Sequence, residues 1–111
     1  MPTILPTDSN DHVIPAVRLK NGGAHTIAAS GTSARNSTAF NTETRVVSLY
    51  ATGAVYIKCG DNTVTATTSD HYFPEGIYYD IAIGGDKVNQ YTHIAALAVD
   101  TNCTLYISEK E

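Results

Sequence analysis

The four histidines are the side chains with the widest chemical range in this sequence, since imidazoles act as bases and as metal ligands. They are His12, His25, His71 and His93, and no two have a spacing that places them on one face of a strand or helix turn. The fold alone would have to assemble a metal site. We therefore expect ordinary surface or half-buried histidines and no bound metal.

Nucleophilic and phosphate-binding motifs are also missing. No serine stands in a G-x-S-x-G elbow, and residues 84–87 (GGDK) lack the spacing of a phosphate-binding loop and the helix pattern that would follow it. Residues 73–76 (FPEG) resemble the proline-glycine turn of cupin barrels, but the metal-binding histidines of cupin enzymes have no counterpart here. We expect a protein that is not an enzyme and has no cofactor, with a cupin-like enzyme as a remote alternative.

Cys59 and Cys103 are the two cysteines, too few and too far apart in the sequence for a disulfide scaffold. We interpret both as buried thiols, and a disulfide between them remains the alternative.

Seven tyrosines and no tryptophan make up most of the aromatic content. Tyr50, Tyr56 and Tyr106 fall on outward positions of predicted strands. Outward tyrosines form either a platform on which a sugar stacks or, more often, cross-strand pairs and subunit contacts. We name these three as candidate partner contacts.

Composition favours one all-β domain. A chain of 111 residues has room for one core, and its abundance of Thr, Ala, Val, Ile and Tyr suits half-buried strands. The net charge of −4 is spread without a like-charged block, so neither nucleic acid nor an anionic membrane is an expected partner. Residues 1–10 lack a signal-peptide pattern, and we expect the chain to stay in the cytosol or to leave it by another route.

Residues 1–11 read as an extended N-terminal arm, and residues 12–111 as the domain. Pro2 and Pro6 favour extended chain, and Ile4 and Leu5 are the apolar residues available for contacts. An arm without a core of its own is usually ordered by a neighbour. Ile4, Leu5 and Val13 are therefore further candidate partner contacts.

The chain then alternates strands and turns. We expect a first hairpin from residues 12–20 and 24–30 around an Asn-Gly-Gly turn, and a loop over 31–41 that tucks Phe40 against the core. A second hairpin spans 44–60, and the character of 61–70, exposed strand or loop, stays open. The remaining predicted strands are 71–73, 77–83, 92–99 (buried on both faces) and 103–108, followed by a solvated end at 109–111.

One hairpin pattern recurs. Residues 44–49 align with 92–97, and residues 55–57 align with 105–107. This indicates either equivalent hairpins in two sheets or the ordinary likeness of any two hairpins.

From residue 40 onward the chain resembles small all-β structural proteins of tailed bacteriophages. The shared pattern is an aromatic residue after a Ser/Thr-rich loop, a T-R-V-V strand, a strand ending in Gly, a Thr-rich loop, an apolar-P-x-G turn, G-D-K-V, an apolar strand and a last strand closing in Ser-Glu. Its elements here are residue 40 and residues 44–52, 59–60, 63–69, 73–76, 84–88, 94–99 and 105–109. The resemblance implies a virion component, such as a capsid decoration or cement protein, that oligomerises and binds a protein lattice.

Together these observations predict a two-sheet antiparallel β sandwich of jelly-roll character with an N-terminal arm. The expected function is that of a non-enzymatic virion protein, made in the host cytoplasm. Its expected partners are itself, as a dimer or trimer, and other virion proteins such as the major capsid protein. The alternative is a carbohydrate or host-receptor binding module.

Overall fold

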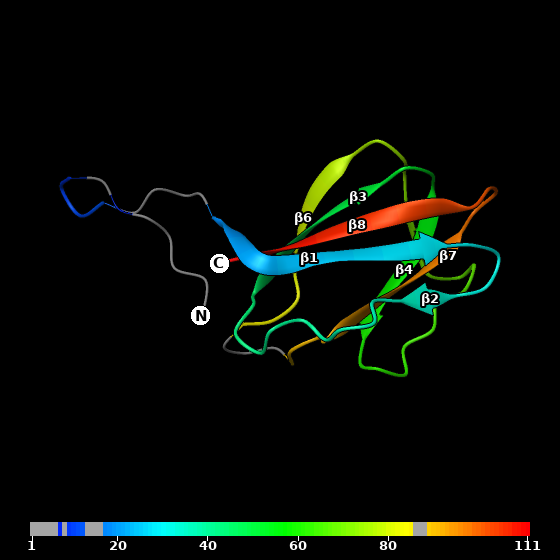
Figure 1. The fold of residues 1–111 in the computed structure, drawn as a ribbon, viewed down its shortest axis with the longest axis horizontal. Helices are drawn as coiled ribbons and strands as arrows, with labels where there is room; N and C mark the ends of the chain where they lie inside the picture. Colours follow the sequence, from blue (N-terminus) through cyan, green and yellow to red (C-terminus); the bar gives the residue numbers. More distant parts are fainter. Residues whose placement is uncertain (1–6, 8, 13–16, 86–88) are drawn as a thin grey trace.

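The computed structural model describes residues 7, 9–12, 17–85 and 89–111. Within these residues the chain forms two antiparallel four-stranded sheets and no helix (Figure 1). The all-β, two-sheet prediction is therefore confirmed, and no helix in this part of the chain has the length and apolarity needed to cross a membrane. The strands are β1 (Leu19–Ala29), β2 (Ala34–Arg35), β3 (Val46–Ala51), β4 (Val55–Gly60), β5 (His71–Phe73), β6 (Tyr78–Ala82), β7 (His93–Ala98) and β8 (Cys103–Lys110).

The strand order pairs the beginning of the chain with its end. One sheet runs β1-β8-β3-β6 and the other β2-β7-β4-β5. Thus β1 pairs with β8, β2 with β7, β3 with β6 and β4 with β5, so the first half of the chain pairs with the second half in reverse order. Within the described chain, β4 and β5 are the consecutive strands that share a sheet, and every other connection crosses between sheets.

The core lies between the two sheets because each strand turns alternate side chains inward. Leu49 of β3 and Leu105 and Ile107 of β8 are fully buried from one sheet, and Val55 and Ile94 from the other. Full burial of an aliphatic side chain of this size stabilises the fold by roughly 1.5–3 kcal/mol. Phe40, predicted to tuck in from a loop, belongs to the same cluster, which confirms that prediction.

The predicted hairpin at 44–60 is wrong in its pairing, although both strands are present. β3 and β4 lie in different sheets; β3 pairs with β8 and β4 with β7. The repeated segment 92–108 behaves in the same way, so the two copies are sheet-crossing corners that pack on each other. Their turns are joined where Thr52 N–H donates to the Thr104 carbonyl (3.0 Å) and Val99 N–H donates to the Ala54 carbonyl (3.1 Å).

The predicted first hairpin is also wrong. Residues 21–23 do not turn the chain but form a bulge inside β1, where Leu19 pairs with Lys110 and Ala24 with Ser108, so β1 carries three extra residues. Gly22 takes a positive φ of 77°. Pairing resumes beyond the bulge, because Arg18 and Glu111 exchange two backbone hydrogen bonds of 2.9 and 2.7 Å. Residues 13–16 of the predicted strand lie outside the described residues.

The prediction that residues 109–111 form a solvated end is wrong. β8 continues to Lys110, and both Glu109 and Lys110 are buried. Glu109 bonds to Asn41, Thr44 and His25, and Lys110 lies against Tyr78 and Asp80.

Residues 61–70 form a loop rather than a strand, which settles the open alternative. The Asp61 and Asp70 carboxylates accept backbone N–H bonds from Thr63 (2.9 Å) and Thr67 (2.7 Å), an arrangement typical of tight turns. The loop places Val64 and other apolar groups on the outer face of the β2-β7-β4-β5 sheet. The resulting second cluster comprises Val64, Ala66, Ala95 and the half-buried Leu97. β7 is accordingly buried on both faces, as predicted.

Candidate interaction surface

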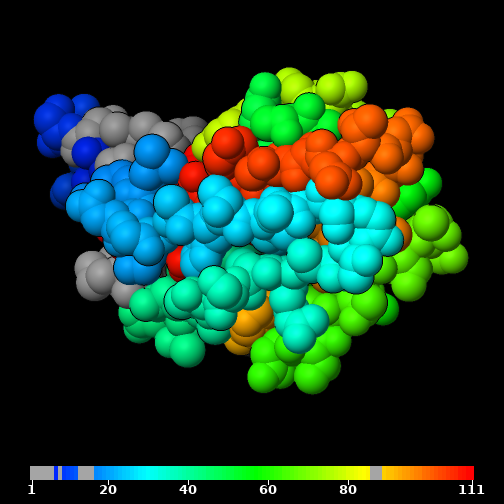
Figure 2. Space-filling model, turned by 45° about the vertical axis from the view of Figure 1, so that its right-hand side comes forward, coloured from blue at the N-terminus to red at the C-terminus, as the bar shows by residue number. Residues whose placement is uncertain are grey.

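A row of tyrosines crosses the outer face of the β1-β8-β3-β6 sheet. Tyr50 of β3 stands opposite Tyr106 of β8 on one side and opposite Tyr78 of β6 on the other. Adjacent strands are about 4.8 Å apart, so the three residues lie side by side. They are exposed by 39% (Tyr50), 48% (Tyr106) and 58% (Tyr78). Figure 2 looks towards this sheet, with β1 and β8 next to each other at the surface.

Polar contacts hold the β6 end of this tyrosine row in place. The Tyr78 hydroxyl donates to Ser48 Oγ at 2.7 Å, and Lys110 Nζ lies 5.2 Å from the centre of the Tyr78 ring. Lys110 Nζ also lies 3.5 Å from Asp80 Oδ1. Burial alone would lower the pKa of Lys110, but the Tyr78 hydroxyl and the Asp80 carboxylate outweigh it and raise that pKa. The ammonium therefore stays charged and neutralises Asp80 beside the row.

An apolar groove adjoins the row around the β6 edge. It lies between the edge strands β5 and β6, has a volume of about 280 Å³, and has walls that include Ile57, Phe73 and Ile81. Cys59 and Tyr79 also line it. Tyr79 stands opposite the fully buried Leu49, yet it is 56% exposed because β6 ends the sheet there. Edge strands keep one row of backbone groups unpaired within their sheet, so this side of the molecule offers both apolar surface and hydrogen-bonding capacity.

The structure brings together two of the predicted contact residues and separates a third. Tyr50 and Tyr106 share the row, whereas half-buried Tyr56 lies on the outer face of the other sheet, where its ring meets Tyr72 edge-on at 6.1 Å. Ile4, Leu5 and Val13 lie outside the described residues.

Sequence reasoning missed Tyr78 as a contact residue. The predicted strand 77–83 contains Tyr78, but the sequence does not give the register that sets Tyr78 beside Tyr50.

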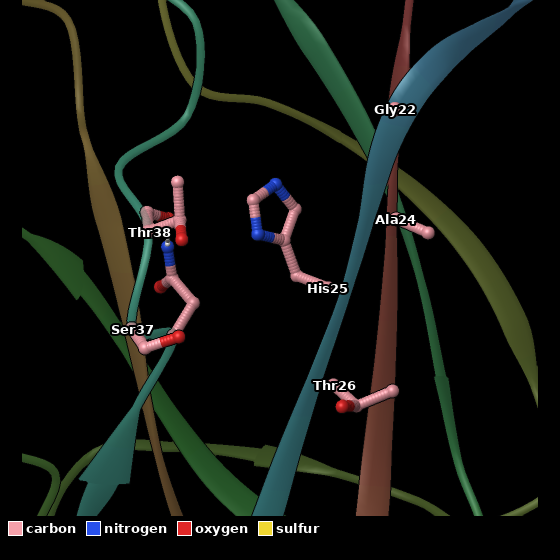
Figure 3. Close-up of a pocket in the computed structure, with 7 residues that line it drawn as sticks. Gly22, Ala24, His25, Thr26, Ser37 and Thr38 are labelled. Atoms are coloured by element: carbon pink, nitrogen blue, oxygen red, sulfur yellow. Dashed lines mark hydrogen bonds between the residues drawn. The ribbon is translucent and has the colours of Figure 1, made fainter.

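A polar cavity of about 240 Å³ lies between β1 and residues 36–38 (Figure 3). The His25 ring points towards it, and His25 Nε2 lies 2.8 Å from Glu109 Oε2. Asn36 is committed to the backbone, because its Nδ2 donates to the Thr38 carbonyl (2.7 Å) and its Oδ1 accepts from Ile94 N–H (2.8 Å). These bonds hold the loop against the two sheets. The polar groups of Asn36 are therefore used to stabilise the fold and are not available to bind a ligand in the cavity.

The remaining candidate groups are dispersed. Among the described residues, no three His, Cys, Asp or Glu side chains gather in a way that could hold a metal ion. Burial lowers the pKa of His93, whose Nδ1 lies 2.8 Å from Thr92 Oγ1. Cys59 and Cys103 are free thiols, as predicted, but they are half-buried where buried thiols were expected. Burial raises the pKa of both.

Comparison with known proteins identified no relatives. A scan of protein-family models, a search of curated proteins and a search of solved structures each returned no match. The tyrosine row and the adjoining groove therefore carry the functional argument.

Proposed function

We propose that this chain is a non-enzymatic structural protein of a bacteriophage virion, specifically a capsid decoration or cement protein that acts as a homo-oligomer. The observation that carries this proposal is the row of three exposed tyrosines on one sheet face. The resemblance of residues 40–109 to phage structural proteins supplies the virion context. In this proposal the protein is made in the host cytoplasm and assembles onto a lattice such as the major capsid protein.

The strand order supports a jelly roll as the scaffold. In a jelly roll, eight strands form two four-stranded sheets through two Greek keys. The orders β1-β8-β3-β6 and β2-β7-β4-β5 support this assignment, because successive strands alternate between sheets except at β4 and β5.

The chemistry of the face favours a protein partner. Tyrosine is enriched at the centres of protein interfaces, whereas unpaired charge is depleted there. Here Tyr78, at one end of the row, lies beside an Asp80–Lys110 pair that carries no net charge. Exposed apolar patches of this kind on a small soluble domain usually mark interaction sites.

Paired variants test the proposal. Tyr50→Ser with Tyr106→Ser removes two of the three rings of the row, including the central one. Tyr91→Ser is the control, because Tyr91 is exposed by 43% on a loop outside the row. We expect light scattering to show that the wild type is a dimer or trimer. In a separate sedimentation assay, the wild type should pellet together with capsid shells. The double variant should bind the capsid shells about tenfold more weakly than wild type, a loss of ~1.4 kcal/mol, while the control binds them as tightly as wild type. If the wild type is a monomer and does not bind the capsid shells, the proposal is refuted.

A carbohydrate or host-receptor binding module is the second candidate, favoured by the same row. Tyr78 offers a ring face bordered by the Asp80 carboxylate and the Lys110 ammonium, and sugars are bound by aromatic faces with polar neighbours. A monomer retained on a glycan array, with retention lost in Tyr78→Ala, would favour this function over the first.

A further inference from the structure

The groove between β5 and β6 is incompletely covered by the described chain. Ile57 and Ile81 in its walls are only half-buried, and Tyr79 at its rim is mostly exposed. Apolar surface left in water costs about 25 cal/mol per Å², so a segment that covers these walls gains stability. The free edges of β5 and β6 can pair with an extended segment, the usual mode of strand addition.

The N-terminal end of the chain has the composition to fill such a groove. Ile4 and Leu5 stand between Pro2 and Pro6, which favour extended backbone and limit strand pairing to the residues between them. In an extended segment, successive side chains point to opposite faces. Beside β6, one of Ile4 and Leu5 would therefore enter the groove and the other would lie on the outer face next to Tyr78.

The direction of the chain favours a neighbouring molecule as the host. Thr7 and residues 9–12 are exposed and lie beyond the start of β1, outside the outline of the two sheets (Figure 1). β1 and β6 are also the opposite edges of their sheet. The fourteen residues from Leu5 to Arg18, which are thirteen steps along the backbone, span up to about 45 Å when extended, enough to reach a second molecule.

We propose that residues 2–6 of one copy dock in the groove between β5 and β6 of a second copy, with Ile4 or Leu5 as the inserted side chain. The inference rests on the proposed homo-oligomer and names the segment and the site that join its subunits. Reciprocal exchange in a dimer would place two such contacts about a twofold axis.

Native Cys59 in the groove wall gives a direct test. We would oxidise full-length Ile4→Cys and Leu5→Cys separately at about pH 8.5, because burial raises the pKa of the Cys59 thiol and only the thiolate reacts. The expected product is a covalent dimer in which the introduced thiol is bonded to Cys59 of the other copy, as mapped by mass spectrometry. One position should react more than the other, and Cys59→Ser should abolish the product.

Three outcomes would overturn the inference: a bond to Cys59 within the same chain, no bond to Cys59, or equal reaction with Cys103. A second measurement is independent of thiol chemistry. Ile4→Asp with Leu5→Asp should weaken self-association about tenfold. Its melting temperature should match that of wild type at concentrations where both proteins are monomeric. If cross-linking fails while the tyrosine variants still weaken assembly, the inference falls and the proposed function stands; if the wild type is monomeric, both fall.

Discussion

The buried Glu109 carboxylate bonds to groups from three separate parts of the chain. Its Oε1 accepts from Thr44 Oγ1 (2.5 Å) and from Asn41 N–H (2.9 Å), and its Oε2 lies 2.8 Å from His25 Nε2. The His25 ring in turn meets Phe40 edge-on at 4.9 Å. One carboxylate that is 3% exposed therefore fastens the loop before β3 to β1 and β8. A buried charge is tolerated only with such partners.

The pKa of Glu109 fixes the sign of a pH effect. Burial raises this pKa, but the hydrogen bonds from Thr44, His25 and Asn41 outweigh burial and leave it below its ordinary value. The carboxylate therefore stabilises the fold fully above the unfolded-state pKa of about 4.3. This stabilisation is lost as the pH falls through the lower folded-state pKa.

We predict that Glu109→Gln lowers the free energy of unfolding by about 1–3 kcal/mol at pH 7, because an amide replaces a charged acceptor. The difference from wild type should shrink towards pH 3. Urea denaturation across this pH range measures it. Glu111→Gln is the control, since its 3.7 Å contact with the exposed Arg18 should contribute less than about 1 kcal/mol. A difference that stays constant down to pH 3 would contradict the assignment.

At the scale of elements, the bulge in β1 sets how the first strand meets the last. Gly22 takes a positive φ, and a Cβ on Gly23 would lie 2.8 Å from Glu109 Cβ. Asn-Gly-Gly is a strong turn signal, and the same conformational freedom serves a bulge. Local sequence does not separate the two, because the difference lies in whether both flanks pair with one strand or with each other.

We predict that Gly23→Ala destabilises the fold more than Gly31→Ala, in which the added Cβ meets nothing within 4 Å. Gly22→Ala should cost about 1–2 kcal/mol from its backbone conformation alone. Chemical denaturation of the three variants gives the ranking. Equal stability of Gly23→Ala and Gly31→Ala would show that β1 and β8 do not approach so closely.

The elements themselves were largely predictable. Alternation placed Tyr50 and Tyr106 on outward strand positions, as observed. The length and apolarity of residues 92–99 predicted a strand buried on both faces, which is correct because the 61–70 loop covers its outer side. The errors concern which strands pair. The predicted hairpins at 44–60 and 92–108 connect strands of different sheets, and the predicted turn at 21–23 is a bulge inside β1.

At the scale of the whole molecule, the tyrosine row exists only through the strand order. Tyr50, Tyr78 and Tyr106 are up to 56 residues apart in the sequence and meet because β3 lies between β6 and β8. The groove likewise depends on the strand order, because it lies between β5 and β6, which are edge strands of the two sheets. Both features lie on one side of the molecule, which suits a protein that assembles side by side with its copies.

Deleting residues 2–11 should separate folding from assembly. We predict a melting temperature close to that of wild type in dilute solution, because Thr7 and residues 9–11 are exposed. Self-association should weaken. Differential scanning calorimetry together with sedimentation at several concentrations tests both halves, and a collapse of the fold would show that this segment belongs to the core.

The sequence by itself determined the all-β class, the outward positions of Tyr50 and Tyr106, the burial of Phe40 and the absence of familiar catalytic motifs. These depend on local periodicity and residue type, which are legible along the chain. Only the tertiary structure decided that Glu109 is buried, that residues 21–23 form a bulge, and that Tyr78 joins Tyr50 and Tyr106. The reason is physical: an alternating strand fits a hairpin partner or a partner in the opposite sheet equally well, and register is fixed by closure of the whole core.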